Sequence, residues 1–138
     1  MNYSERWIQY FFDVAQRTAK LSYAKRLQVG AVAAKDKRII ACGFNGTPTG
    51  FSNDCETEFG LTDSCVIHAE ENLILFSAKH GISLLGCDMF CTHSPCVHCS
   101  RMIISCGIKQ FFYINDYRYD EGIVLLKTAG LKIEQFKL

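Results

Sequence analysis

Two short motifs constrain the fold of this chain more than any other feature: H-A-E at residues 68–70 and S-P-C-V-H-C at residues 94–99. Cys96 and Cys99 stand three positions apart, so on a helix they lie on one face and can bind a single ion. The Ser-Pro step before them suits a helix cap followed by the first helical position, which would place both sulfurs in the first turn. The helix dipole favours thiolates there, so the motif predicts a helix that begins with a metal-binding pair.

The H-A-E motif makes a similar prediction about its own surroundings. His68 and Glu70 would lie on nearly opposite sides of a regular helix, so both can face one site only where the chain is entering a helix. Residues 69–79 are mostly good helix formers with acidic residues in the first turn, and Gly81 is a plausible stop. We therefore expect two helix starts to meet at one ion.

Such a meeting would give a catalytic rather than a closed metal site. His68, Cys96 and Cys99 supply three ligands, and catalytic zinc typically keeps its fourth position open for water, whose pKa it lowers to roughly 7. Two thiolates roughly cancel the charge of the ion, so Glu70 is better placed as a proton shuttle than as a fourth ligand. Taken alone, however, the C-x-x-C pair could also be a redox pair or half of a structural zinc site.

The combination of H-x-E with P-C-x-x-C is the signature of zinc-dependent nucleobase deaminases. Beyond it, the chain resembles the deoxycytidylate (dCMP) deaminase family over most of its length. The similar stretches are residues 26–50, 66–81, 92–116 and 122–135. The resemblance implies hydrolysis of dCMP to dUMP and ammonia with one zinc ion per subunit, in which Glu70 protonates the ring nitrogen and then passes a proton to the departing amine.

The same resemblance implies roles for further residues around the substrate. Asn45 would hydrogen-bond the sugar, the backbone N–H of Ala69 would bind the pyrimidine carbonyl, and the region around Ser94 would receive the amine. Tyr117 resembles the family's tyrosine near the nucleotide phosphate, although Tyr119 could take that role.

The G-F-N-G block at residues 43–46 is similar to the family's G-Y-N-G element, with Phe44 in place of tyrosine. In the family this loop lies beside the substrate and is tied to control by dCTP and dTTP. Gly43, Phe44 and Gly46 are therefore candidate effector residues, with Mg²⁺ accompanying a triphosphate effector, and a homo-oligomer, often a hexamer, is implied. From the residues alone, Asn-Gly is a strong turn signal and can be no more than that.

A second metal site is not expected. Many relatives carry a cysteine that helps to hold a structural zinc where this chain has Ala24. Cys55 and Cys65 lie in an acidic loop and could hold some metal, but their spacing is not diagnostic.

The other histidines are weaker candidates. His80 precedes a glycine at a helix end, where imidazole favours the terminal carbonyls, and His98 is out of phase with both cysteines. His93 could line the pocket or pack under the loop that follows it.

Composition limits the remaining possibilities. A chain of 138 residues makes one domain, here residues 1–138, and its net charge of +1 offers no basic stripe for a long nucleic acid. Its short basic cluster, Lys20, Lys25 and Arg26, is enough for a small anionic substrate or is simply a solvated helix end. With no signal peptide and no apolar run of ~18 residues, the eight cysteines predict reduced thiols in the cytoplasm, without a membrane partner.

Alternating helix and strand patterns predict a layered α/β sheet. The family resemblance implies a three-layer α/β/α fold of the cytidine deaminase type, with a central mixed sheet of about five strands. Expected strands are residues 29–34, 38–44, 88–92, 110–114 and about 132–136; besides the two metal helices, helices are expected at residues 4–20 and 120–128. The first helix carries an apolar stripe formed by Trp7, Tyr10, Phe11, Val14, Thr18 and Leu21. Cys42, Cys91 and Cys106 lie in apolar stretches and are expected in the core.

Two other functions stay open on the residues alone. A related deaminase could act on dCTP, a free nucleoside, another heterocycle or tRNA adenosine, or the zinc could merely stabilise a binding module without catalysis. Glu70 argues against the second alternative, because a closed structural site has no use for an unligated carboxylate. The near-neutral charge and the G-F-N-G block favour a small deoxynucleotide.

Overall fold

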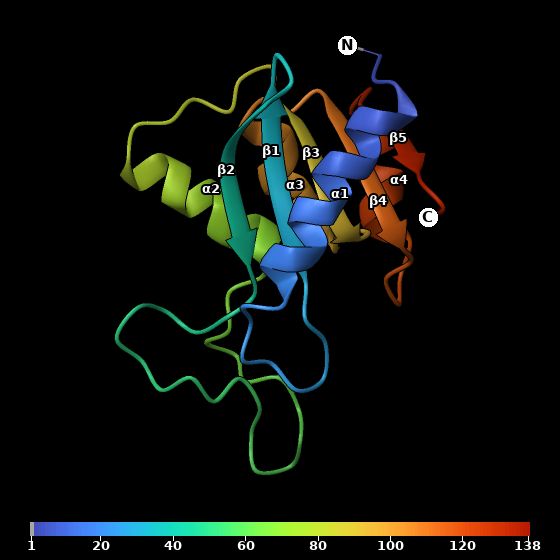
Figure 1. Ribbon diagram of the computed structural model, residues 1–138. Helices are drawn as coiled ribbons and strands as arrows, with labels where there is room; N and C mark the ends of the chain where they lie inside the picture. Colours follow the sequence, from blue (N-terminus) through green and yellow to red (C-terminus); the bar gives the residue numbers. More distant parts are fainter. Residues whose placement is uncertain (1) are drawn as a thin grey trace.

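The computed structural model describes residues 2–138 and contains one five-stranded mixed sheet with helices on both faces (Figure 1). The strand order is β2-β1-β3-β4-β5. The strands are β1 (Gly30–Lys35), β2 (Arg38–Phe44), β3 (Asp88–His93), β4 (Gln110–Asn115) and β5 (Lys132–Gln135). β1 runs antiparallel to both β2 and β3, whereas β3, β4 and β5 are parallel. The predicted mixed sheet of five strands is confirmed.

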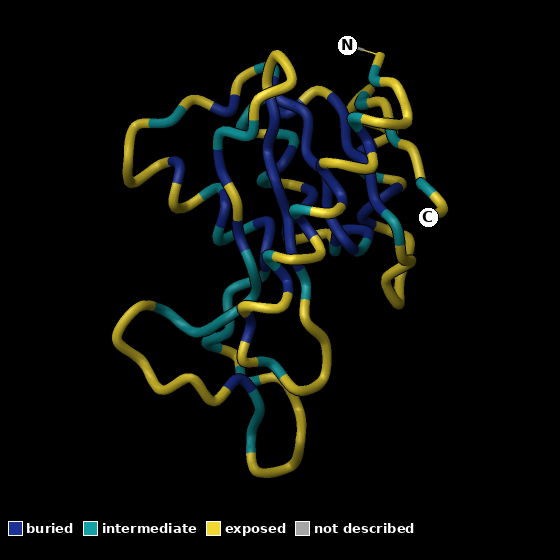
Figure 2. The backbone as a smooth tube through the Cα atoms, viewed as in Figure 1, coloured by how far each residue is buried: buried dark blue, intermediate teal, exposed yellow. Residues whose placement is uncertain are grey.

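Four helices complete the layers: α1 (Glu5–Ala19), α2 (Ala69–Lys79), α3 (Val97–Ser105) and α4 (Glu121–Thr128). α1 covers one face of the sheet and the other three helices cover the opposite face (Figure 1). Alternate strand residues divide the core accordingly: Val32 and Phe90 pack with α1, while Ala33 and Met89 pack with the helices on the other side. Figure 2 shows this buried centre and the exposed loops below it. Within residues 2–138, none of the helices has both the length and the apolarity of a membrane span.

Two glycines allow helices to lie unusually close to the sheet. A Cβ on Gly30 would stand 2.0 Å from the carbonyl oxygen of Ala15 in α1, and one on Gly43 would stand 2.5 Å from the carbonyl oxygen of Ala69 in α2. Any larger side chain would push the helix away. Gly43 therefore fixes the first turn of α2, which carries part of the site, against β2.

The predicted apolar stripe of α1 is partly wrong. Tyr10 and Leu21 are 46% and 52% exposed, whereas Ile8, Phe12 and Ala15 are buried against the sheet. The helix carries apolar residues on more than one side, and the buried face is the one that brings the small Ala15 against β1. Hydrophobic spacing alone could not choose between these faces.

The predicted burial of three cysteines holds for one of them. Cys91 is buried, Cys106 is partly buried and Cys42 is exposed. In β2 the neighbours of Cys42, Ala41 and Gly43, face α2, so Cys42 points to the opposite face. Because β2 is the edge strand, that face is incompletely covered there.

A two-residue turn joins β1 to β2. Asp36 and Lys37 both have positive φ, 52° and 63°, which is the conformation of a type I′ hairpin turn. The Lys37 ammonium lies 5.4 Å from the centre of the Trp7 ring of α1. The turn is therefore tied to the first helix by a cation–π contact.

Candidate active site

A pocket lies at the end of the sheet where β3 finishes and α2 and α3 begin. Several segments that are distant in the sequence meet there. Its lining includes Arg26, Asn45, Glu70, His93, Cys96 and Tyr117. The long loop between β2 and α2 and the loop before β1 form its outer wall.

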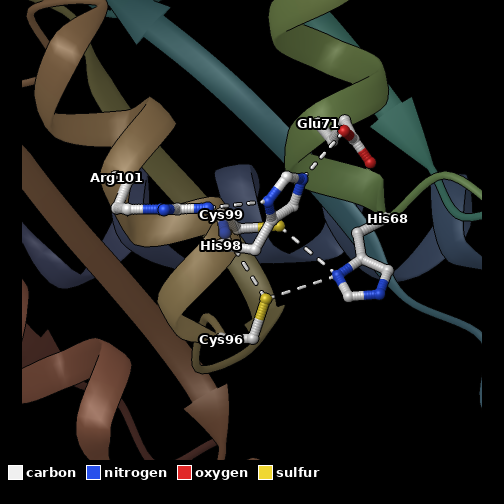
Figure 3. Close-up of polar contacts among 6 residues, drawn as sticks. All are labelled: His68, Glu71, Cys96, His98, Cys99 and Arg101. Atoms are coloured by element: carbon white, nitrogen blue, oxygen red, sulfur yellow. Dashed lines mark hydrogen bonds and ion pairs between the residues drawn. The ribbon is translucent and has the colours of Figure 1, made fainter.

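His68, Cys96 and Cys99 meet on one side of this pocket (Figure 3). The His68 Nδ1 atom is 3.5 Å from the Cys96 Sγ and 3.4 Å from the Cys99 Sγ, and the three ligand atoms lie within 4.8 Å of one another. Zn–S bonds of about 2.3 Å and Zn–N bonds of about 2.0 Å in a tetrahedron predict N···S separations of about 3.5 Å. The side chains therefore fit one zinc ion. In the part of the chain that the structure describes, no other three His, Cys, Asp or Glu side chains form such a group.

The start of α2 explains how His68 and Glu70 face the same site. His68 is the cap residue, with an extended backbone (φ −68°, ψ 159°), and the helix begins at Ala69. Glu70 lies in the first helical turn. The prediction that the chain enters a helix at this motif is confirmed.

The start of α3 differs from the prediction by two residues. The helix begins at Val97, and its cap is Cys96 rather than Ser94. The Cys96 sulfur accepts the backbone N–H of Cys99 at 3.4 Å, so one sulfur atom both caps the helix and faces the metal position. Both sulfurs still lie at the helix start, where the dipole favours negative charge.

The electrostatics of the cluster favour a thiolate. The pKa of Cys96 is lowered to about 3, first by the thiol of Cys99 and then by His68, both of which hydrogen-bond to it. The same contact raises the pKa of the Cys99 thiol, and the Cys96 sulfur raises the pKa of His68. Thiolate is the form that binds a metal ion.

Glu70 lies beside this cluster without belonging to it. Its side chain is buried, with 5% of the residue exposed, and burial raises the pKa of the carboxyl group to about 7. A carboxyl group of that kind can both accept and donate a proton near neutrality.

Asn45 and Ala69 both line the pocket. The Asn45 Oδ1 accepts the N–H of Val29 and its Nδ2 donates to the carbonyl of Leu27, each at 2.8 Å. One further N–H and one further lone pair of the amide are left for a ligand. Ala69 is the first residue of α2, so its N–H has no partner within the helix.

Ser94 and Tyr117 are joined to each other in the pocket lining. The backbone N–H of Tyr117 donates to the Ser94 hydroxyl at 2.6 Å, and both residues line the pocket. Tyr119 is 56% exposed and does not line it. Of the two tyrosines considered from the sequence, Tyr117 is therefore the one beside the site.

The candidate effector residues lie next to the pocket rather than in it. Gly43, Phe44 and Gly46 line a separate hollow. The carbonyl of Phe44 accepts the side-chain N–H of Asn72 at 2.7 Å, and Gly46 pairs with Ile67 across the loop. Asn45, between Phe44 and Gly46 in the chain, lines the first pocket and not this hollow.

The contacts of the other three histidines show where each side chain lies. His98 is paired with Glu71 at 3.0 Å (Figure 3), while His80 packs against the ring of Phe76. Neither belongs to the group formed by His68, Cys96 and Cys99. His93 does line the pocket, which was one of the two positions considered for it.

Sequence reasoning missed part of the pocket wall. Cys55 and Glu56 line the pocket, and the Glu56 carboxylate accepts the backbone N–H of Lys25 at 3.1 Å and 3.2 Å. This contact joins two loops 31 residues apart, and no motif or periodicity marks it. Cys55 thus belongs to the pocket wall, and neither it nor Cys65 is in the metal-binding group.

Comparison with known proteins places the chain among deaminases. The family described as "Cytidine and deoxycytidylate deaminase zinc-binding region" matches residues 5–115. ComE operon protein 2 of Bacillus subtilis is 39% identical over 137 residues, covering 96% of this chain and 72% of that protein. Deoxycytidylate deaminase of Mus musculus is 32% identical over 143 residues, covering 94% of this chain and 79% of that protein. The crystal structure of dCMP deaminase from the cyanophage S-TIM5 in complex with dCMP and dUMP is 40% identical and has a TM-score of 0.95, with 98% of this chain and 100% of that chain covered.

Proposed function

This chain belongs to the cytidine and deoxycytidylate deaminase family, and we propose that it hydrolyses dCMP to dUMP and ammonia with a zinc ion held by His68, Cys96 and Cys99. One observation carries the proposal: three ligand atoms spaced for a single ion lie beside the buried carboxyl group of Glu70 at the wall of an open pocket. A purely structural zinc would need a fourth protein ligand and no free carboxylate.

The chain's own residues have distinct tasks in this reaction. When bound, zinc supplies a water molecule of lowered pKa as the nucleophile. Glu70 takes up the two protons that this water loses and passes one to the ring nitrogen of cytosine and the other to the departing amine, while the water oxygen becomes the new carbonyl oxygen of dUMP. The N–H of Ala69 at the start of α2 donates to the pyrimidine carbonyl oxygen, and the chain around Ser94 receives the amine.

The nucleotide part of the substrate is assigned to the other walls of the pocket. Asn45 hydrogen-bonds the sugar with its remaining amide valences, and Tyr117 lies near the phosphate. Among the described residues Arg26 is the one lysine or arginine that lines the pocket, and it supplies positive charge for the phosphate dianion. A 5′-phosphate therefore distinguishes the substrate from a nucleoside.

The proposal also covers the regulation of the enzyme and its assembly into an oligomer. Family resemblance supports control by dCTP and dTTP through Gly43, Phe44 and Gly46, with Mg²⁺ accompanying a triphosphate, and a homo-oligomer such as a hexamer. The reduced cysteines support a cytoplasmic location.

Ammonia release tests the proposed reaction. dCMP, dCTP, deoxycytidine and cytidine are offered separately to the zinc-loaded protein, with and without a chelator. We expect dCMP to react fastest and the chelator to abolish turnover. Equal rates with dCMP and deoxycytidine would contradict phosphate recognition, and turnover that survives complete removal of zinc would contradict the metal site.

A further inference from the structure

His93 is the last residue of β3 and lines the pocket two residues before Pro95. Its Nδ1 lies 2.8 Å from the Thr92 hydroxyl. The opposite ring nitrogen, Nε2, has no hydrogen-bond partner among residues 2–138. The ring is thus held at one nitrogen, with the other left for the contents of the pocket.

The hydrogen bonds of Thr92 determine which nitrogen carries the proton. The Thr92 hydroxyl is buried and already accepts the backbone N–H of Gly30 at 3.2 Å. Its single proton then has one possible acceptor in the described part of the chain, the Nδ1 of His93. With Nδ1 as the acceptor, a neutral ring carries its proton on Nε2.

The opposite tautomer would leave a buried proton without a partner. If Nδ1 carried the hydrogen, the Thr92 oxygen would accept from both Gly30 and His93, and its own hydroxyl proton would have no acceptor. Leaving a buried donor unsatisfied is costly. Burial also lowers the pKa of His93, which keeps the ring neutral.

We propose that His93 binds the nucleotide by donating its Nε2–H to an oxygen of the substrate, and that Thr92 is the positioning residue that fixes this tautomer. The identity of the ligand rests on the proposed function, whereas the tautomer rests on the protein alone. A neutral donor suits this position because most of the carbonyl, sugar and phosphate oxygens of dCMP can accept a hydrogen bond. Only the phosphate needs a cation. The role of His93 differs from that of His68, because the Nδ1 of His68 faces the two cysteine sulfurs.

The tautomer is measured by ¹⁵N NMR of the imidazole groups in the zinc-loaded protein. We expect the Nε2–H form for His93 in the wild type and in Thr92→Ser, which keeps the hydroxyl, and loss of that preference in Thr92→Val. An Nδ1–H signature in the wild type would overturn the proposal. An unchanged tautomer in a folded Thr92→Val protein would overturn the role of Thr92.

Ligand contact is measured on the same preparations. We expect dUMP to shift the His93 Nε2 resonance, and His93→Leu to raise the KM for dCMP roughly tenfold with a smaller change in kcat, as for the loss of one hydrogen bond. His93→Gln, which keeps a side-chain N–H, should recover part of this loss. An unchanged KM in His93→Leu would overturn the contact. A wild-type protein with the Nε2–H tautomer but no activity on dCMP would instead contradict the proposed function.

Discussion

Replacement of Glu70 by Gln separates proton transfer from everything else that the pocket does. Gln has nearly the shape of Glu, so it should fill the same buried position in the first turn of α2 without disturbing the helix. It cannot carry a proton between the water, the ring nitrogen and the departing amine. Because Glu70 lies outside the group of three ligand atoms, zinc binding should persist.

The expected loss follows from the role assigned to the carboxyl group. General acid–base catalysis typically contributes roughly 10²–10⁴-fold, or about 3 to 5 kcal/mol of barrier. We therefore expect kcat for dCMP to fall by at least roughly 10²-fold, measured as ammonia release, with one zinc ion per chain by elemental analysis. Full activity in a zinc-loaded Glu70→Gln protein would refute the assignment.

Glu71→Gln is the matched control. It makes the same chemical change one position along, but the Glu71 carboxylate pairs with His98 and does not line the pocket. Its activity should stay close to that of the wild type. A comparable loss in both variants would mean that negative charge near the zinc, and not proton transfer, supports the rate.

Three further changes test other parts of the structure. Cys96→Ser and Cys96→Ala should both lower the zinc content. In the zinc-free proteins the Ala variant should be less stable than the Ser variant by about 1 kcal/mol, because only Ser can still cap α3. Equal unfolding midpoints in urea would contradict the capping role. Lys37→Gly should stabilise the protein by about 1 kcal/mol in thermal unfolding, because glycine adopts a positive φ without strain. The lost contact with Trp7 offsets part of this gain. A lower melting temperature would show that the contact outweighs the strain. Burial and the hydrogen bond to Asp88 raise the pKa of Tyr3, so the stability it contributes is present below roughly pH 10 and is lost as the pH rises further. Relative to the wild type, Tyr3→Phe should therefore be less stable near neutrality, with a difference that shrinks in alkaline urea titrations; a constant difference would contradict the linkage.

The sheet, the helices and the metal ligands were all predictable, because each follows from a local pattern. The central strands are short apolar runs that are buried on both faces, and the helices of the H-A-E and S-P-C motifs begin within two residues of where caps and spacing placed them. The i, i+3 spacing of Cys96 and Cys99 needs only the geometry of one helical turn. These features depend on neighbours a few residues away.

What the sequence could not predict depends on contacts between distant segments. The pairing of the Glu56 carboxylate with the loop before β1, and the choice of Ile8, Phe12 and Ala15 as the buried face of α1, are decided by tertiary packing. The capping role of Cys96 was missed for a different reason, because Ser and Pro before it are a stronger local signal than a cysteine sulfur. The tautomer of His93 likewise requires Gly30, which is 62 residues away from Thr92.

The division of labour between framework and loops has a consequence for how such an enzyme can diversify. His68, Cys96, Cys99 and Glu70 lie at helix starts that are packed against the sheet, whereas much of the outer wall comes from the chain between residues 45 and 68, which contains two isolated bridges but no helix or strand. Surface loops tolerate changes in length far better than packed elements do. Insertions or deletions in that stretch could thus exchange one nucleotide for another while the reaction at the ring is inherited unchanged.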